Sequence, residues 1–182
     1  MVPEVAAAWT LVESFNMSNK DEDPFRKHPL KTNAPVNEKS PNFDRYRMSQ
    51  PQMISLKAKS THWRATCSFP VNGVDGRDQV RGNFKDFDIM TFIESGLCKQ
   101  MEYINIRGNE CSQCTAKWWA KSGSQNLHTD NTEGDCDFRP TVGIISGEDN
   151  FGLYDNVNQD FRCTATNAST TNWWFGGYQC SE

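Results

Sequence analysis

Aliphatic residues and long apolar runs are scarce in this chain of 182 residues. Hydrophobic residues make up 36% of it, and the mean hydropathy is -0.73. No apolar run approaches the ~20 residues that a membrane-spanning helix needs, so the sequence predicts no membrane insertion. A core must instead form around large rings, since eleven Phe and six Trp are present and each ring buries roughly 150–250 Å². At this length we expect one domain, residues 1–182.

A strongly basic charge balance is also missing. Nineteen Lys and Arg stand against 23 Asp and Glu, a net charge of -4. No block of five or more basic residues occurs, which argues against nucleic acid or an anionic membrane as a partner. The N-terminus, MVPEVAAAWTLV, lacks the basic region of a secretory signal, and Glu4 interrupts its apolar stretch. If the protein is extracellular, we expect the sequence to be a fragment or a mature form.

Recognisable catalytic motifs are absent as well. The sequence has no GxSxG, no HExxH and no Gly-rich phosphate loop. None of the three histidines, His28, His62 and His128, stands in a nucleophile motif with Ser or Cys. The sequence therefore favours a protein that is not an enzyme, with a secreted enzyme whose active site is scattered along the chain as the alternative.

Cysteine, in contrast, is plentiful. The seven residues are Cys67, Cys98, Cys111, Cys114, Cys136, Cys163 and Cys180. The scarcity of aliphatics and the sequons at Asn16 and Asn167 favour disulfides and an extracellular location. The alternative is a set of reduced thiols, with the CxxC at Cys111 acting as a redox dithiol or as half of a zinc site. Seven is odd, so one thiol is free or has its partner elsewhere, and six cysteines can pair in about 15 ways.

Hydrophobic patterning predicts an α+β fold that is rich in β-strands. We expect strands over residues 8–16, two short strands within 53–69, a strand over 98–108 that pairs with 114–120, and a short buried strand over 140–146. Residues 83–94 fit a helix and a strand about equally well. Asn-Gly and Asp-Gly within 71–78 signal turns.

Long irregular loops complete this expectation. Residues 19–52 hold five prolines and little periodicity, so we expect an irregular loop with at most a helical turn near residues 43–48. Residues 122–134 are expected to form a polar loop. A loop as long as 19–52 inside a domain is often functional or held by crosslinks.

The acidic stretch from Glu148 to Asp160 is a candidate cation site. Its carboxylates and amides are one or two residues apart among turn formers, and such spacing can aim several oxygens at one Ca²⁺ ion. Asx-rich turns without metal have the same composition. The sequence therefore leaves two readings open, a calcium loop and a solvated turn.

The C-terminal aromatic run, Trp173-Trp174-Phe175, also has two interpretations. Adjacent residues of a strand point to opposite faces. These rings therefore either belong to the core or leave one indole exposed to stack on a sugar.

The chain resembles fibrinogen-like C-terminal domains. AWTLVESF near the start is similar to their opening GGWTLV strand, and FGLYDNVNQDFRCTA with NWWFGGYQC at the end is similar to their calcium loop, paired Trp and closing Cys. THWRATCSFP and EYINIRGNECSQCTA resemble a divergent set of such domains from extracellular proteins of corals and sea anemones. That set covers nearly the whole chain, whereas ordinary fibrinogen domains cover only its two ends.

The resemblance implies specific roles. It implies a disulfide between Cys163 and Cys180, and Ca²⁺ bound by Asp155 with Asn158 or Asp160. The family's second calcium carboxylate falls near Val157, which has no ligating side chain. The ligand-binding rim implied at the C-terminus contains Trp173, Trp174 and Tyr178.

The expected function is extracellular recognition. A lectin-like module that binds a glycan or an extracellular protein, in adhesion, innate recognition or matrix, needs no catalytic motif. The alternatives are the secreted enzyme and a purely structural matrix component.

Overall fold

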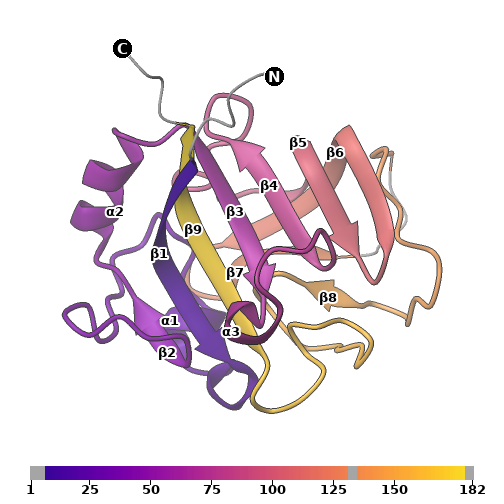
Figure 1. Ribbon diagram of the computed structural model, residues 1–182, viewed down its shortest axis with the longest axis horizontal. Helices are drawn as coiled ribbons and strands as arrows, with labels where there is room; N and C mark the ends of the chain where they lie inside the picture. Colours follow the sequence, from indigo (N-terminus) through magenta and orange to yellow (C-terminus); the bar gives the residue numbers. More distant parts are fainter. Residues whose placement is uncertain (1–6, 131–134, 179–182) are drawn as a thin grey trace.

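The computed structural model describes residues 7–130 and 135–178. Within these ranges, nine strands form one antiparallel sheet in the spatial order β2-β1-β9-β3-β4-β5-β6-β7-β8 (Figure 1). The strands are β1 (Ala7–Asn16), β2 (Arg45–Arg47), β3 (His62–Cys67), β4 (Gln79–Asn83), β5 (Ser95–Ile106), β6 (Asn109–Lys121), β7 (Gln125–Asp130), β8 (Asp149–Asn150) and β9 (Thr170–Tyr178). The helices are η1 (Met17–Asn19), α1 (Asp23–Arg26), α2 (Gln50–Lys57) and α3 (Phe69–Asn72). The expected β-rich antiparallel architecture with few short helices is confirmed.

The two ends of the described chain pair with each other. β9 lies between β1 and β3 and is antiparallel to both (Figure 1). The strand expected over residues 8–16 is therefore confirmed, and so are β5 and β6, which form a hairpin. None of the described helices is long and apolar enough to cross a membrane.

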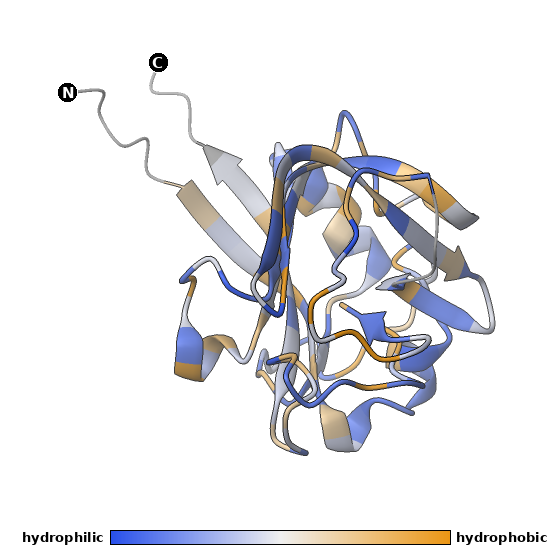
Figure 2. Ribbon diagram, turned by 90° about the vertical axis from the view of Figure 1, so that its right-hand side faces the viewer, coloured by the Kyte–Doolittle hydropathy of each residue, from blue (hydrophilic) through white to orange (hydrophobic). Residues whose placement is uncertain are grey.

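The sheet curls so that strands from its two halves approach each other. Asn126 on β7 donates hydrogen bonds to Glu13 Oε1 on β1 (3.1 Å) and to the carbonyl of Phe25 in α1 (2.7 Å). These contacts join elements that are far apart in the strand order. Figure 2, seen from the side, shows the sheet bending around the interior.

Large rings fill the concave side of the sheet, as the scarcity of aliphatics requires. Trp63, Trp118 and Trp173 are each at most 1% exposed, and their ring centroids lie 5.8–6.2 Å apart. Phe87 meets two of them, and its carbonyl accepts the Trp63 Nε1–H at 2.9 Å. Such ring pairs contribute about 0.5–1.5 kcal/mol each beyond the area that they bury.

A second, smaller aromatic cluster lies on the convex side. Trp174 points away from its neighbour Trp173, yet it is only 7% exposed. Phe69 and Phe43 pack on it at centroid distances of 4.7 and 6.1 Å, and its Nε1–H donates to Thr66 Oγ1 at 2.9 Å. Both faces of β9 are therefore covered at this point.

The expected long loop at 19–52 is organised around one buried cation. Arg47 on β2 is fully buried and forms an ion pair with Glu13 at 2.9 Å. Its two Nη atoms also donate to the carbonyls of Pro24, His28, Pro29 and Thr32 at 2.6–2.9 Å. The segment is thus largely irregular, but it is held in place and carries α1, β2 and the start of α2.

Several local predictions were wrong. Residues 54–57 belong to α2 and not to a strand. Pro51 lies in the first turn of this helix, where its missing N–H is not needed. Residues 45–47 form β2 and not a helical turn. The supposed polar loop at 122–134 contains β7, and the supposed buried strand at 140–146 is an exposed turn segment.

Residues 83–94, which fitted helix and strand equally well, form neither. After β4 ends at Asn83 they run through turns to Thr91. The side chains of Asn83 and Asp88 cap backbone N–H groups of Asp86 and Met90 there. These local bonds satisfy the backbone without a ladder or a helix.

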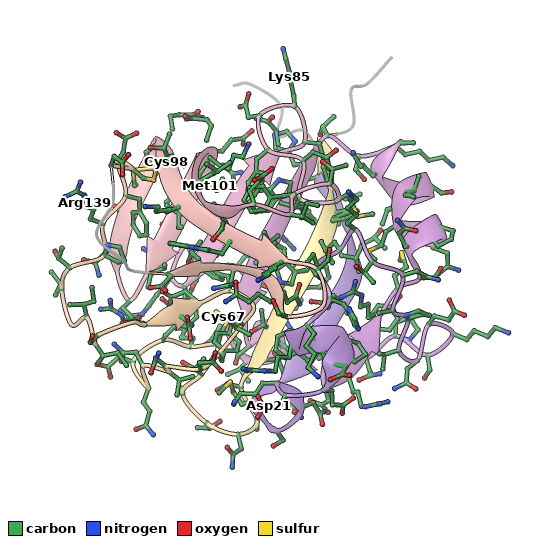
Figure 3. The ribbon with its side chains drawn as sticks, turned by 180° about the vertical axis from the view of Figure 1, so that it is seen from behind. Asp21, Cys67, Lys85, Cys98, Met101 and Arg139 are labelled. Carbon is green, nitrogen blue, oxygen red and sulfur yellow. A yellow bond between two sulfur atoms is a disulfide. The ribbon has the colours of Figure 1, made fainter. Side chains whose placement is uncertain are left out.

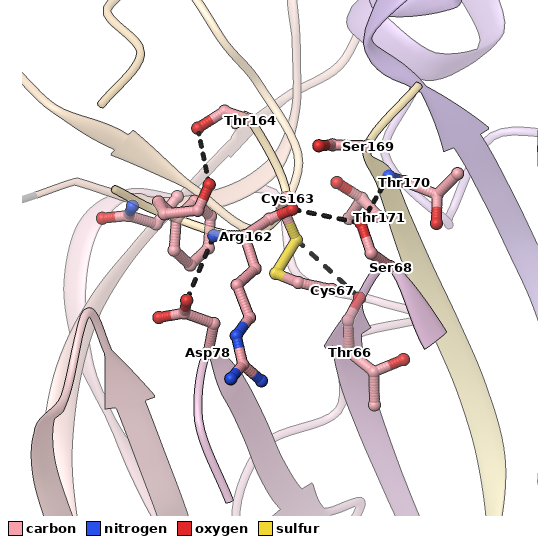
Figure 4. The surroundings of a disulfide bond; sticks show 12 residues. Thr66, Cys67, Ser68, Asp78, Arg162, Cys163, Thr164, Ser169, Thr170 and Thr171 are labelled. Atoms are coloured by element: carbon pink, nitrogen blue, oxygen red, sulfur yellow. Dashed lines mark hydrogen bonds between the residues drawn. A yellow bond between two sulfur atoms is a disulfide. The ribbon is translucent and has the colours of Figure 1, made fainter. Parts of the chain in front are cut away.

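Three disulfides form among the described residues, Cys67–Cys163, Cys98–Cys136 and Cys111–Cys114. The expected bond from Cys163 to Cys180 is wrong, because Cys163 is bonded to Cys67 on β3 (Figure 4). Cys180 itself lies outside the described residues. Figure 3 shows Cys67 near the middle of the molecule and Cys98 toward one side.

Candidate functional site

A polar pocket lies between β7 and the segment 147–156, which includes β8. Its volume is about 250 Å³, and it is lined by Trp119, Gln125, His128, Asp130, Gly147, Asp149, Leu153, Asp155 and Asn156. β7 and β8 are adjacent strands in the sheet, so the ladder places His128, Asp130 and Asp149 at one edge. We call this cavity the β7–β8 pocket.

His128 is the most deeply buried polar side chain of the β7–β8 pocket, at 3% exposed. Its Nδ1 lies 2.8 Å from the carbonyl of Asn126, so Nδ1 carries the proton and donates it. The other ring nitrogen, Nε2, is then an acceptor, and it has no hydrogen-bond partner within residues 7–130 and 135–178. Burial lowers the pKa of His128, which keeps the ring neutral at pH 7.

Asp149 supplies a buried carboxylate to the same pocket. Its Oδ2 accepts the backbone N–H groups of Asp155 (2.7 Å) and Asn156 (2.8 Å). These bonds close a turn that brings residues 155 and 156 to the rim. Burial raises the pKa of Asp149, although the two N–H donors and nearby His128 act in the opposite direction.

Trp119 forms the aromatic wall. It stacks on His128 with ring centroids 6.0 Å apart and planes 22° apart. Trp118, the preceding residue of β6, points to the core, so Trp119 necessarily points to the opposite face. On the rim, Asp155 is 52% exposed and forms an ion pair with Arg26 at 2.7 Å.

The β7–β8 pocket therefore combines three carboxylates, a neutral imidazole, two side-chain amides and an indole. The lining groups themselves carry no cation, and Arg26 offsets one of the negative charges from outside. Such a lining offers many hydrogen-bond acceptors and one partly exposed ring. It suits a neutral, hydroxyl-rich ligand or a cationic one.

The residues predicted for the ligand-binding rim are not at this site. Trp173 and Trp174 are 1% and 7% exposed, so neither presents a ring face to a ligand, and the expected stacking surface is not formed. The backbone of Tyr178 ends β9 opposite Ala7. Its side chain lies outside what the structure describes.

The three residues predicted to bind calcium have different surroundings. Asp155 is paired with Arg26. The buried Asn158 donates to Glu148 Oε2 (3.0 Å) and to the carbonyl of Gly143 (2.8 Å), and its Oδ1 accepts the N–H of Asp160. Within the described ranges, no group of three or more His, Cys, Asp or Glu is placed to hold a metal ion.

The two sequons lie side by side. Asn167 is exposed in a turn, and its carbonyl accepts the N–H and the hydroxyl of Ser18, both at 3.3 Å. Asn16 is half-buried, and its Oδ1 accepts the N–H of Asn19 at 3.1 Å. Asn167 is thus the more open of the two predicted glycosylation sites.

The disulfides bear on the alternative chemistry of the CxxC. Cys111 and Cys114 are bonded to each other, and so are Cys98 and Cys136. The zinc site that would join these four thiols is therefore not formed. Of the seven cysteines, six are in disulfides as predicted, and Cys180 lies outside the described residues.

Sequence reasoning found part of the β7–β8 pocket and missed the rest. The acidic stretch 148–160 was singled out, and Asp149, Asp155 and Asn156 belong to it. His128 was missed because residues 122–134 were predicted to form a loop, and Trp119 was missed although its strand was predicted. A periodic signal existed on β6, where Trp118 and Trp119 must face opposite ways, but the sequence does not say which of them faces out.

Comparison with known proteins returned no matching family model, no matching curated protein and no matching solved structure.

Proposed function

We propose that this protein is an extracellular recognition module that binds a glycan in the β7–β8 pocket without chemical turnover. The observation that carries the proposal is the imidazole of His128, whose acceptor Nε2 has no hydrogen-bond partner in the described part of the chain and is not among the atoms closed off from solvent. Around it, carboxylates and amides accept or donate to hydroxyls, and Trp119 offers a surface for the C–H face of a sugar ring. A hydroxyl of the ligand can donate a hydrogen bond to this nitrogen.

The extracellular location is supported by the disulfides. Bonds of this kind form and persist in oxidising compartments and are rare in the cytosol. Three of them in a domain with few aliphatics match a secreted or cell-surface protein. The proposal does not depend on the resemblance to fibrinogen-like domains, since the disulfide that this resemblance implied is not formed.

The test is a glycan array probed with the disulfide-intact protein, followed by calorimetry on the sugars that bind. Asp155→Asn should weaken binding at least tenfold, because it removes an acceptor from the rim. Asp75→Asn is the matched control, since Asp75 is similarly exposed (46%) and is also paired with an arginine, Arg162. Trp119→Ala should weaken binding as well.

Two outcomes would overturn the glycan proposal. One is that no sugar on the array binds. The other is that Asp155→Asn and Asp75→Asn have equal effects. Running the array with and without EDTA separately tests the predicted calcium, since a calcium-dependent site loses its ligand on chelation.

A second candidate function, hydrolysis, is favoured by one observation. His128 and Asp149 line the same cavity, and burial shifts their pKa values toward each other, down for the imidazole and up for the carboxyl. A carboxyl and an imidazole whose pKa values are brought closer together can act as an acid–base pair. Release of reducing sugar from the glycans that bind, abolished by Asp149→Asn, would identify an enzyme instead of a binding module.

A further inference from the structure

Arg64 on β3 is a half-buried cation on the convex side of the sheet. Its guanidinium carbon lies 4.4 Å from the ring centroid of Trp9, 5.2 Å from that of Trp174 and 5.9 Å from that of Phe69. Its Nε is buried and has no hydrogen-bond partner in residues 7–130 and 135–178. Across the described ranges, no carboxylate lies within ion-pair distance of it.

The two buried arginines of the described residues, unlike the half-buried Arg64, are neutralised. Arg47 pairs with Glu13 at 2.9 Å and Arg107 pairs with Glu148 at 2.8 Å. Burial, with the nearby charge of Arg81 as a smaller cause, lowers the pKa of Arg64 to about 10, so this side chain is still charged at pH 7. A half-buried charge with an unsatisfied donor is costly, and a native structure that keeps one often does so for a ligand.

A small cavity opens beside this cation. It has a volume of about 110 Å³ and is lined by Ala7, Trp9, Arg64, Val74, Gln79, Val80 and Arg81. It shares no lining residue with the β7–β8 pocket. We call it the Arg64 pocket.

The donors of the Arg64 pocket converge because of strand register. Arg64 on β3 lies directly opposite Arg81 on β4. Arg81 uses its Nε to reach Glu102 at 3.2 Å, and it is 35% exposed. Gln79 accepts the N–H of Gly76 with its Oε1, so its amide group remains a donor.

We propose that the Arg64 pocket binds the carboxylate of a small organic acid, either free or at the end of a larger ligand. A guanidinium presents its N–H groups in a planar fork that matches a carboxylate with two parallel hydrogen bonds. The stacked rings hold that fork in one orientation, so little side-chain freedom is lost on binding. Trp9 and Val74 form an apolar wall, which favours an acid whose carboxylate is attached to an apolar or aromatic body.

The probe for this site is sodium benzoate, titrated into the disulfide-intact protein and followed by calorimetry and by the NMR signals of the arginine Nε–H groups and of the indole N–H of Trp9. We expect millimolar binding that shifts the Arg64 and Trp9 signals. Benzamide, the neutral analogue of the same shape, should bind at least tenfold more weakly. Because the pair is partly exposed to solvent, 0.5 M NaCl should weaken benzoate binding.

Matched variants locate the effect. Arg64→Gln should reduce benzoate affinity at least tenfold, and Arg64→Lys should restore only part of it, since an ammonium lacks the planar fork. Arg77→Gln is the control, because Arg77 is two positions before Gln79 in the chain but does not line the pocket. The benzoate affinity of this variant should be unchanged.

Four results would overturn the proposal. They are equal binding of benzamide and benzoate, unchanged affinity in Arg64→Gln, tighter binding of sulfate than of benzoate, and benzoate shifts in the wild type that spare Arg64. All but the second use only the wild-type protein, so the proposal stays testable if Arg64→Gln fails to fold. None of these results bears on the glycan proposal, because the β7–β8 pocket and the Arg64 pocket share no lining residue.

Discussion

Removing the Cys67–Cys163 disulfide should destabilise the fold more than removing either of the other two disulfides among the described residues. The bond joins residues 96 positions apart and connects β3 to the segment that leads into β9. In the chain-entropy model, a loop of that length contributes about 4.7 kcal/mol by restricting the unfolded state. The Cys98–Cys136 bond closes 38 positions, for which the same relation gives about 3.9 kcal/mol.

Burial should widen this difference. Cys67 and Cys163 are 2% and 0% exposed, whereas Cys98 is exposed. Replacing the first pair with alanine therefore also removes buried sulfur contacts from the core. The total stability of proteins is about 5–15 kcal/mol, so the double variant Cys67→Ala/Cys163→Ala should retain little of its folding free energy.

Urea unfolding measures this directly. With an m-value of about 2 kcal/mol/M, the midpoint of Cys67→Ala/Cys163→Ala should fall by about 2 M. Cys98→Ala/Cys136→Ala is the control, and it should lose about 0.8 kcal/mol less from loop length alone. The reasoning is refuted if the control loses as much stability as the first variant, or more.

Three further predictions follow from the buried groups. Arg47→Met should destabilise the fold by about 3–5 kcal/mol in urea unfolding, because it leaves the buried carboxylate of Glu13 without its cation. Arg45→Met is the control at an exposed ion pair, and it should cost less than about 1 kcal/mol. The pKa of His128 is lowered in the folded protein, so as the pH falls the unfolded chain binds a proton at this imidazole before the folded chain does. The free energy of unfolding should therefore decrease as the pH drops below about 6.5. His128→Gln should flatten that part of the stability profile, and an unchanged slope would contradict the lowered pKa of His128. Gly152→Ala should cost about 3 kcal/mol or more in thermal unfolding, since the new Cβ would meet a carbonyl of β7 at 1.9 Å, while Gly73→Ala, with open space around it, should cost about 1 kcal/mol.

Strands were predicted correctly where the local pattern of apolar residues was enough to identify them. Residues 8–16 and 98–108 alternate or run apolar between turn formers, and both form strands. Prediction failed at β7, where polar side chains are buried on both sides. Asn126 and His128 satisfy their polar atoms through Glu13, Phe25 and the local backbone, and no window of local sequence contains those partners.

Exposure of the C-terminal rings shows a second limit. Alternation along β9 correctly implies that Trp173 and Trp174 face opposite sides of the sheet. It does not reveal that Phe43 and Phe69 cover the outer one. Covering a ring requires segments that are remote in the chain, so its exposure is a tertiary property.

The sequence by itself determined the kinds of interaction that this fold uses: rings in place of aliphatics, disulfides as crosslinks, and a β-rich chain. The tertiary structure alone decided the partners. Cys163 pairs with Cys67 because β3 lies beside β9 in the sheet, and the segment that holds Cys163 leads into β9. Trp119, His128 and Asp149 meet because β6, β7 and β8 are adjacent strands. Residue type fixes what a side chain can bond, but proximity between distant residues depends on strand order and curl, which no local pattern encodes.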